Sequence, residues 1–146
     1  MAATRRADAT WSGDLLKGKG TVSAGTSRLF RDLPISWATR TEAPAGQTSP
    51  EELLAAAHAA CFSMAFSNQL AKNGTPATSL DVSSDVTFDK VGDGWKVTKS
   101  ALTVRGTVPG IDKAKFRELA EAAKDGCPIS GALKGNVELS VEPTLG

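Results

Sequence analysis

The sequence predicts an α+β domain, in which strands and helices occupy separate stretches of the chain. Strand patterns punctuated by glycine and proline fill the first 40 residues. Alternating apolar and polar residues follow a long helix, over 80–88 and again over 95–104. Because no βαβ alternation, internal repeat or linker divides the 146 residues, we expect a single domain, residues 1–146.

Short strands and turns are expected in the N-terminal part. A strand over 11–16 precedes a turn over 18–20, and further strands are predicted over 21–23 and 33–37. Pro44 and Gly46 interrupt the segment that follows.

A long central helix has clear signals at both ends. Ser49 suits the N-cap, Pro50 the first helical position, and Glu52 completes a capping box. Asn73-Gly74 is a typical helix end. Residues 53–71 carry no charge, but their alanines and polar residues make a poor membrane span. We therefore predict a helix buried on all sides in the core of a soluble protein.

The second half of the chain reads as a hairpin, two helices and a strand. Asp93-Gly94 is a hairpin signal. Asp112 is the expected N-cap of a helix with an Ile111–Phe116 staple, ended by Gly126. Its apolar face is spaced by helical periodicity: Phe116, Leu119, Ala120 and Ala123. A short helix from Pro128 to Leu133 and a strand over 137–141 complete the chain.

Charge is nearly balanced, with 17 Lys and Arg against 16 Asp and Glu. This balance gives no electrostatic case for nucleic acid or an anionic membrane as a partner. No apolar stretch follows Met1, so no secretory signal is expected and a cytoplasmic protein is predicted. In that compartment a cysteine pair is more often catalytic, metal-binding or redox-active than a structural disulfide.

The cysteines, Cys61 and Cys127, leave several interpretations open. Cys61 lies in an alanine-rich helix, where burial makes a thiol inert unless a cation lies beside it. His58, one turn earlier, is either that cation or a core histidine. Cys127 precedes Pro128 and is a candidate N-cap, where the helix dipole favours a thiolate, or simply a small residue at a junction. Physical chemistry alone thus favours Cys127 as the more reactive thiol.

Other common sites have little support. Cys61, His58 and Cys127 offer three zinc ligands without a C-x-x-C spacing, so we expect no metal. No Gly-rich phosphate loop or G-x-S-x-G elbow is present in the sequence.

Several segments resemble the OsmC/Ohr family of thiol peroxidases. Residues 49–65 resemble its central helix, and 108–112 and 126–130 resemble two further family segments. Residues 11–23 resemble the N-terminal hairpin of the OsmC branch. The resemblance implies an OsmC-like fold, with antiparallel sheets wrapped around central helices. It also implies an intertwined homodimer with active sites at the subunit interface.

The resemblance implies reduction of organic hydroperoxides and, less efficiently, of hydrogen peroxide. Cys61 matches the residue that attacks the peroxide and becomes a sulfenic acid, and Cys127 matches the resolving residue that forms a disulfide with it. This order reverses the assignment from the N-cap argument. The family uses no haem, metal or other cofactor, and an external dithiol, suggested to be of lipoyl type, restores the pair.

Arg40 matches the OsmC-branch arginine that would stabilise the thiolate; Arg28 and Arg31 are the alternatives. Glu51 matches the carboxylate that orients this arginine, although alone it reads as a surface charge favoured by the helix dipole. A helix rises about 1.5 Å per residue, so about 15 Å separates Glu51 from Cys61. Glu51 is therefore expected to act on Cys61 of the partner chain, unless the helix bends.

Two alternatives to a peroxidase remain from the residues. One is thioester hydrolysis or transfer, which needs a single cysteine. The other is a binding module for a lipid-like ligand, with an apolar pocket lined by Leu54, Phe62 and Met64.

Overall fold

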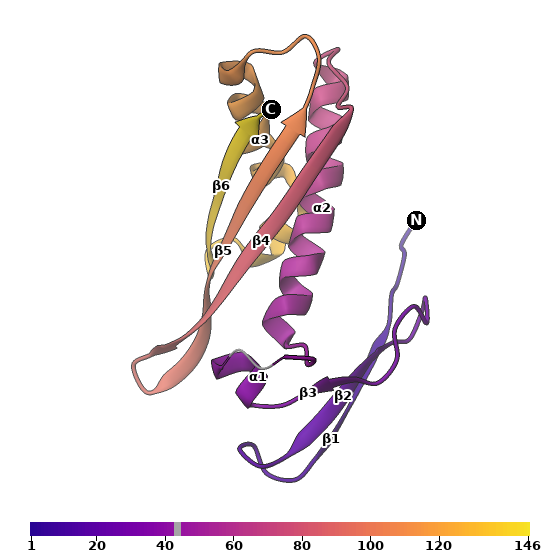
Figure 1. Cartoon of the computed structure of the whole chain (residues 1–146), viewed down its shortest axis with the longest axis vertical. Coiled ribbons are helices and arrows are strands. Elements are labelled where there is room, and N and C mark those ends of the chain that lie inside the picture. The colour runs from indigo at the N-terminus through magenta and orange to yellow at the C-terminus, as the bar shows by residue number, and fades with distance from the viewer. Residues whose placement is uncertain (43–44) are drawn as a thin grey trace. The chain divides into compact units, whose positions relative to one another are not determined.

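The described residues, 1–42 and 45–146 of a computed structural model, divide into two units, residues 1–52 and 53–146 (Figure 1). Pro44, expected to interrupt the chain, lies outside the described residues. Whether the units behave as one domain over 1–146 stays a prediction. Among the described residues, no helix has the length and apolar character needed to span a membrane.

The first unit holds a three-stranded antiparallel sheet and a short helix. Strands β1 (Ala7–Ser12), β2 (Lys19–Ala24) and β3 (Leu33–Ile35) pair in that order, and α1 (Ala38–Thr41) follows. The first strand lies earlier than the predicted 11–16, and Lys19 and Gly20 belong to β2 and not to the turn. The turn comes sooner because Gly13 has a φ of +92° and the Asp14 carboxylate accepts from the Lys17 N–H at 2.8 Å.

The predicted central helix is confirmed as α2 (Pro50–Lys72). The Ser49 hydroxyl accepts from the Glu52 N–H at 3.1 Å, as in a capping box, while the Glu52 carboxylate accepts from the Thr48 hydroxyl at 2.7 Å. At the other end, Gly74 has a φ of +80°, and the Gly74 and Thr75 N–H groups donate to Ala71 and Leu70. This pattern is a Schellman motif.

One row of α2 residues, spaced by one helical turn, is fully buried: His58, Phe62, Phe66 and Leu70. The prediction that the helix is buried on all sides is wrong for the single chain. Ala56, Ala57, Ala60 and Met64 are exposed on it, with Met64 at 68%. The helix therefore presents one apolar face to the core of its own chain and a second one outward.

The second unit contains a long hairpin formed by β4 (Ser79–Val91) and β5 (Gly94–Thr107). The predicted hairpin is confirmed, but its central residues are Gly92-Asp93, since Val91 pairs with Gly94. Gly92 has a φ of +62°, which suits the first central position of a type II′ turn. A β-bulge between Thr87 and Phe88 shifts the register near this turn.

The sheet of the second unit is mixed, which corrects the expectation of antiparallel sheets. Strand β6 (Glu138–Leu145) pairs in parallel with β5. A parallel pair needs a crossover connection, and α3 (Lys113–Gly126) with α4 (Pro128–Leu133) supplies it. The chain therefore does contain one βαβ connection, contrary to the sequence prediction, although α+β describes the rest.

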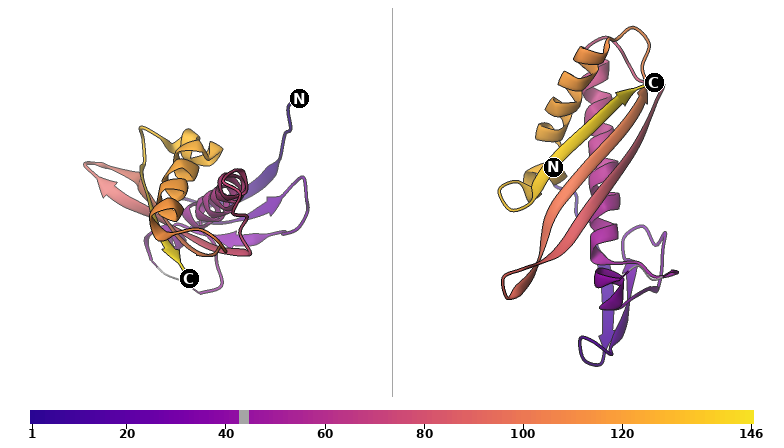
Figure 2. Two further views of the ribbon diagram at one scale, coloured as in Figure 1. Left: turned by 90° about the horizontal axis from the view of Figure 1, so that it is seen from above. Right: turned by 60° about the vertical axis from the view of Figure 1, so that its left-hand side comes forward.

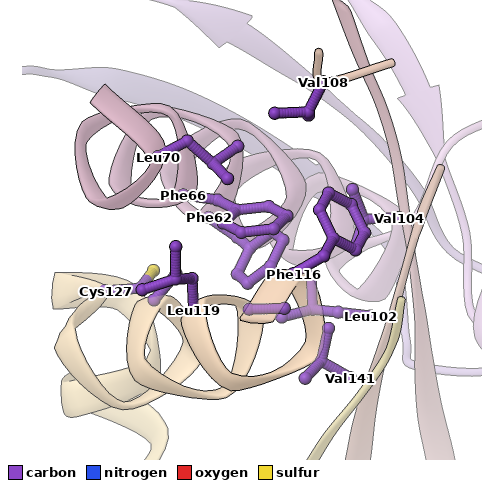
Figure 3. Close-up of a cluster of buried hydrophobic side chains, with 12 residues drawn as sticks. Phe62, Phe66, Leu70, Leu102, Val104, Val108, Phe116, Leu119, Cys127 and Val141 are labelled. Atoms are coloured by element: carbon purple, nitrogen blue, oxygen red, sulfur yellow. The ribbon is translucent and has the colours of Figure 1, made fainter. Parts of the chain in front are cut away.

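The core lies between one face of this sheet and the helices α2 and α3, which lie side by side (Figures 1 and 2). Figure 3 shows Phe62 and Phe66 of α2 turned toward Phe116 of α3. The ring centroids of Phe66 and Phe116 are 5.0 Å apart. The predicted apolar face of α3 is confirmed by burial, and Asp112 caps this helix by accepting from the Lys115 N–H at 2.7 Å.

Gly106 of β5 leaves room for the Phe116 ring, because a Cβ at this position would lie 2.7 Å from the ring. We expect Gly106→Ala to lower the free energy of unfolding by about 1–3 kcal/mol through overpacking. Urea unfolding followed by circular dichroism measures this difference.

Gly131→Ala on α4 is the matched control, since a Cβ there meets nothing within 4 Å. This helical substitution should be neutral or should stabilise by about 0.5–1 kcal/mol. Equal effects of the two substitutions would contradict the packing argument.

Candidate active site

The two thiols predicted to be functional lie within hydrogen-bonding reach of each other in the second unit. Cys61 comes from α2 and is half-buried, whereas Cys127 lies between α3 and α4 and is 1% exposed. Both are free thiols, and each shifts the pKa of the other. The fold thus brings together two residues that are remote in sequence.

Local sequence explains the position of Cys127 at the edge of the core (Figure 3). Gly126 is the last residue of α3, Pro128 is the first of α4, and Cys127 between them is extended, with φ −68° and ψ 124°. Its carbonyl oxygen accepts from the Gly131 N–H at 2.9 Å. The backbone N–H groups of Ile129 and Ser130, at the start of α4, help to lower the pKa of its thiol.

The surroundings shift the ionisation of the two thiols in opposite directions. Burial raises the pKa of Cys61, and its hydrogen bond to Cys127 raises that pKa further. Burial also opposes ionisation of Cys127, but hydrogen bonds from Cys61, Ser130 and Ile129 outweigh it and lower the pKa of Cys127. Within one chain Cys127 is therefore the thiol whose ionisation is favoured, as the N-cap argument predicted.

His58 is a core histidine, so this interpretation of the sequence is confirmed. The side chain is fully buried, and its Nδ1 and Nε2 lie 2.6 Å from the Ser100 hydroxyl and 2.8 Å from the Ser130 hydroxyl. Burial lowers the pKa of His58, which keeps the imidazole neutral near pH 7. A neutral ring cannot be the cation that Cys61 requires.

Arg40 and Glu51, the other predicted site residues, form an ion pair in the first unit. The Arg40 Nη2 lies 2.7 Å from Glu51 Oε1, and its Nε lies 3.1 Å from the same oxygen. The Glu51 side chain is 8% exposed and that of Arg40 is 29% exposed. The guanidinium carbon also lies 5.7 Å from the centre of the Trp37 ring. The alternatives, Arg28 and Arg31, are exposed.

The Arg40 guanidinium borders an apolar cavity of about 330 Å³ in the first unit. The cavity is lined by Trp11, Leu15, Ile35, Ser36, Trp37, Arg40 and Pro50. Sequence patterns did not predict this cavity, because its lining comes from β1 and the turn after it, from the segment between β3 and α1, and from the start of α2, with no shared spacing.

In the described part of the chain, Phe62 and Met64, expected to line one apolar pocket with Leu54, lie on different faces of α2. Phe62 is fully buried in the core, whereas Met64 is 68% exposed. The expectation was wrong because neighbouring positions on a helix point in different directions, about 100° apart per residue.

No set of three or more His, Cys, Asp or Glu side chains placed to hold a metal ion occurs within residues 1–42 and 45–146. The chemistry that the described side chains offer is that of a thiol pair and of a guanidinium fixed by a carboxylate.

Comparison with known proteins agrees with these features. Residues 43–142 match the family model described as OsmC-like protein. The chain is 44% identical to peroxiredoxin OsmC of Escherichia coli (strain K12) over 142 residues, which cover 97% of this chain and 98% of that protein.

Solved structures share the fold. The organic hydroperoxide resistance protein OhrB of Bacillus subtilis superposes with a TM-score of 0.75 at 29% identity, covering 95% of this chain and 98% of that one. An organic hydroperoxide resistance protein from Elizabethkingia anophelis gives a TM-score of 0.77 at 22% identity, with both chains fully covered. The family match and the near-complete alignment with the Escherichia coli protein together establish that this chain belongs to the OsmC family.

Proposed function

We propose that this chain is a thiol peroxidase that reduces organic hydroperoxides to alcohols, and hydrogen peroxide less efficiently. The pair of free thiols, Cys61 and Cys127, whose side chains lie close enough for each to shift the pKa of the other, is the observation that carries the proposal. The relatives are named peroxiredoxin and organic hydroperoxide resistance protein, and these names support the same activity. A thioester or lipid-binding role would not require two thiols in contact.

In the proposed reaction, the Cys61 thiolate attacks the distal peroxide oxygen, and the O–O bond breaks. The alcohol leaves, and Cys61 becomes a sulfenic acid. The Cys127 thiolate then attacks the Cys61 sulfur, which forms a disulfide and releases the oxygen as water. An external dithiol, proposed to be of lipoyl type, reduces the disulfide without any bound cofactor.

Arg40 is proposed to supply the cation that Cys61 needs. Because burial raises the pKa of Cys61, its thiolate requires a charge that survives in an apolar site. A guanidinium stays protonated there and presents several donors. The two-oxygen contact with the buried Glu51 carboxylate fixes its orientation.

A homodimer is proposed to complete the active site. Glu51 and Cys61 lie on one helix, and a rise of about 1.5 Å per residue puts about 15 Å between them. Arg40 and Glu51 of one subunit are therefore proposed to serve Cys61 of the other. The exposed apolar face of α2, with Ala57, Ala60 and Met64, supports a second copy as its cover. A single domain over 1–146 and a cytoplasmic location complete the proposal.

Titration of the fully reduced protein with one equivalent of cumene hydroperoxide tests the function. We expect both thiols to disappear with loss of two hydrogens, since a disulfide forms. Cys61→Ser should abolish the reaction, and Cys127→Ser should stop at a sulfenic acid. Intact mass and free-thiol assays measure these outcomes, with Ser63→Ala as control because its hydroxyl bonds only the Ala60 carbonyl oxygen. Unchanged thiols in the wild-type protein would refute a peroxidase.

Arg40→Lys should lower the rate constant for Cys61 oxidation about 100-fold, because a lysine cannot reproduce the paired contacts. Glu51→Gln should lower it by about tenfold, since the carboxylate acts only through the arginine. Stopped-flow kinetics measures these rates. Arg28→Lys at an exposed site is the control, and an equal loss there would remove the assignment from Arg40.

Met64→Glu should shift the protein from dimer to monomer, because it places a charge on the outward apolar face of α2. Sedimentation velocity measures the shift, and the monomer should keep both thiols while losing peroxidase activity. Glu118→Lys, on the exposed side of α3, should remain dimeric and active. A monomer with full activity would contradict the role of the partner chain.

A further inference from the structure

A continuous row of hydrogen bonds crosses the second unit from the half-buried Ser84 to Ser130, three residues after Cys127. Ser84 Oγ lies 2.9 Å from Ser100 Oγ, which lies 2.6 Å from His58 Nδ1. His58 Nε2 lies 2.8 Å from Ser130 Oγ. Ser130 is the third residue of α4, for which Cys127 is the N-cap, and the Ser130 side chain lowers the pKa of the Cys127 thiol. The five groups come from β4, β5, α2, α4 and the α3–α4 junction.

The middle of this row is sealed from solvent. His58 and Ser100 are 0% exposed and Ser130 is 2% exposed, whereas Ser84 is half-buried. Water therefore does not compete for the imidazole or for the Ser130 hydroxyl. In a dry site, each donor must be matched to an acceptor inside the row.

Counting protons gives the row a direction. A neutral imidazole has one N–H and one acceptor nitrogen, and each hydroxyl has one proton to donate. If the Ser130 hydroxyl donates to the ionised Cys127 sulfur, the Ser130 oxygen must accept from His58 Nε2–H. Nδ1 then accepts from Ser100, which in turn accepts from Ser84. All four donors point toward the sulfur.

We propose that His58 is a positioning residue for Cys127: with Ser84 and Ser100 behind it, it holds the Ser130 hydroxyl as a donor to the sulfur. The row, here called the serine–histidine relay, is Ser84, Ser100, His58 and Ser130. His58 does not touch the reacting atoms and acts through Ser130. An apolar residue at position 58 would fill the same space but would leave the Ser130 hydroxyl free to turn away.

The relay rests on the proposed function and serves its second step. The Cys127 thiolate attacks the sulfur of the Cys61 sulfenic acid; the S–S bond forms and the S–O bond breaks. The oxygen leaves as hydroxide and is neutralised by the proton that Cys127 released on ionising, so water is the product and no further oxidant or reductant is needed. A thiolate at Cys127 is the required nucleophile.

Other ionisable groups near Cys127 do not replace the relay. Cys61 of α2 hydrogen-bonds its sulfur and is itself consumed by the peroxide. Lys124 of α3, one turn earlier, lies 2.9 Å from Glu121 and 3.9 Å from Asp125, so its charge is balanced locally.

Titration of the Cys127 thiolate in a Cys61→Ser background tests the relay without peroxide. The ultraviolet absorbance of the thiolate is followed against pH in the full-length protein. Adding Ser130→Ala should raise the pKa of Cys127 by about one unit, because it removes a hydrogen bond to a charged group. Adding His58→Gln should raise it in the same direction, and adding Ser63→Ala should leave it unchanged. An unchanged pKa in the Ser130→Ala variant would overturn the relay.

Disulfide formation provides a kinetic readout in the protein with both cysteines. At a pH below the pKa of Cys127, a rise of one unit in that pKa lowers the fraction of thiolate about tenfold. A more basic thiolate is also more nucleophilic, which offsets part of this loss. Ser130→Ala should therefore slow disulfide formation about threefold while leaving the rate of sulfenic acid formation unchanged. Equal slowing of both steps would mean a merely structural effect and would refute the relay.

The imidazole of His58, the single histidine of the chain, gives one pair of ¹⁵N resonances. When Cys127 is ionised, the relay requires the imidazole proton on Nε2, and a proton on Nδ1 would overturn the relay. This measurement uses the wild-type protein, so it holds even if the substituted proteins fail to fold. Both the titration and the tautomer are independent of peroxide. Failure of the peroxidase function therefore appears as thiols that resist hydroperoxide, and failure of the relay as an unchanged pKa or the wrong tautomer.

Discussion

The rotation of α2 about its own axis is the constraint on which the second unit depends. One row of side chains, from His58 through Phe62 and Phe66 to Leu70, faces the sheet and α3. Since Phe66 lies against Phe116 at a ring distance of 5.0 Å, the helix cannot turn without opening the core. This fixed rotation places Cys61 beside the row, half-buried and within reach of the sulfur at the end of α3.

The same packing explains why a thiol can be buried and still be reactive. The backbone N–H groups at the start of α4 and the side chain of Ser130 help to lower the pKa of Cys127. These donors favour an ionised Cys127, whereas Cys61 lacks comparable support within its own unit and its pKa is raised. In the proposed peroxidase the two thiols therefore differ in how readily they ionise, because their surroundings differ. The Arg40–Glu51 pair is proposed to supply the positive charge that Cys61 lacks.

The polar side chains buried in this core are hydrogen-bonded to one another. A buried histidine with two serine partners costs little only when every donor and acceptor is matched. Among the described residues, no buried side-chain nitrogen or oxygen lacks a hydrogen-bond partner. In the proposed relay this complete matching gives a row of hydroxyl and imidazole protons one direction, toward Cys127.

The sequence by itself determined the features that depend on neighbouring residues. Capping residues and apolar periodicity predicted the helices α2 and α3 and the positions where they begin and end. The resemblance to a family singled out the candidate site residues Cys61, Cys127, Arg40 and Glu51. Only the tertiary structure decided the parallel pairing of β6, the two-residue turn Gly92-Asp93, and the serine partners of His58. These depend on which distant segments meet in space, and that is set by the packing of the whole core, which local patterns do not encode.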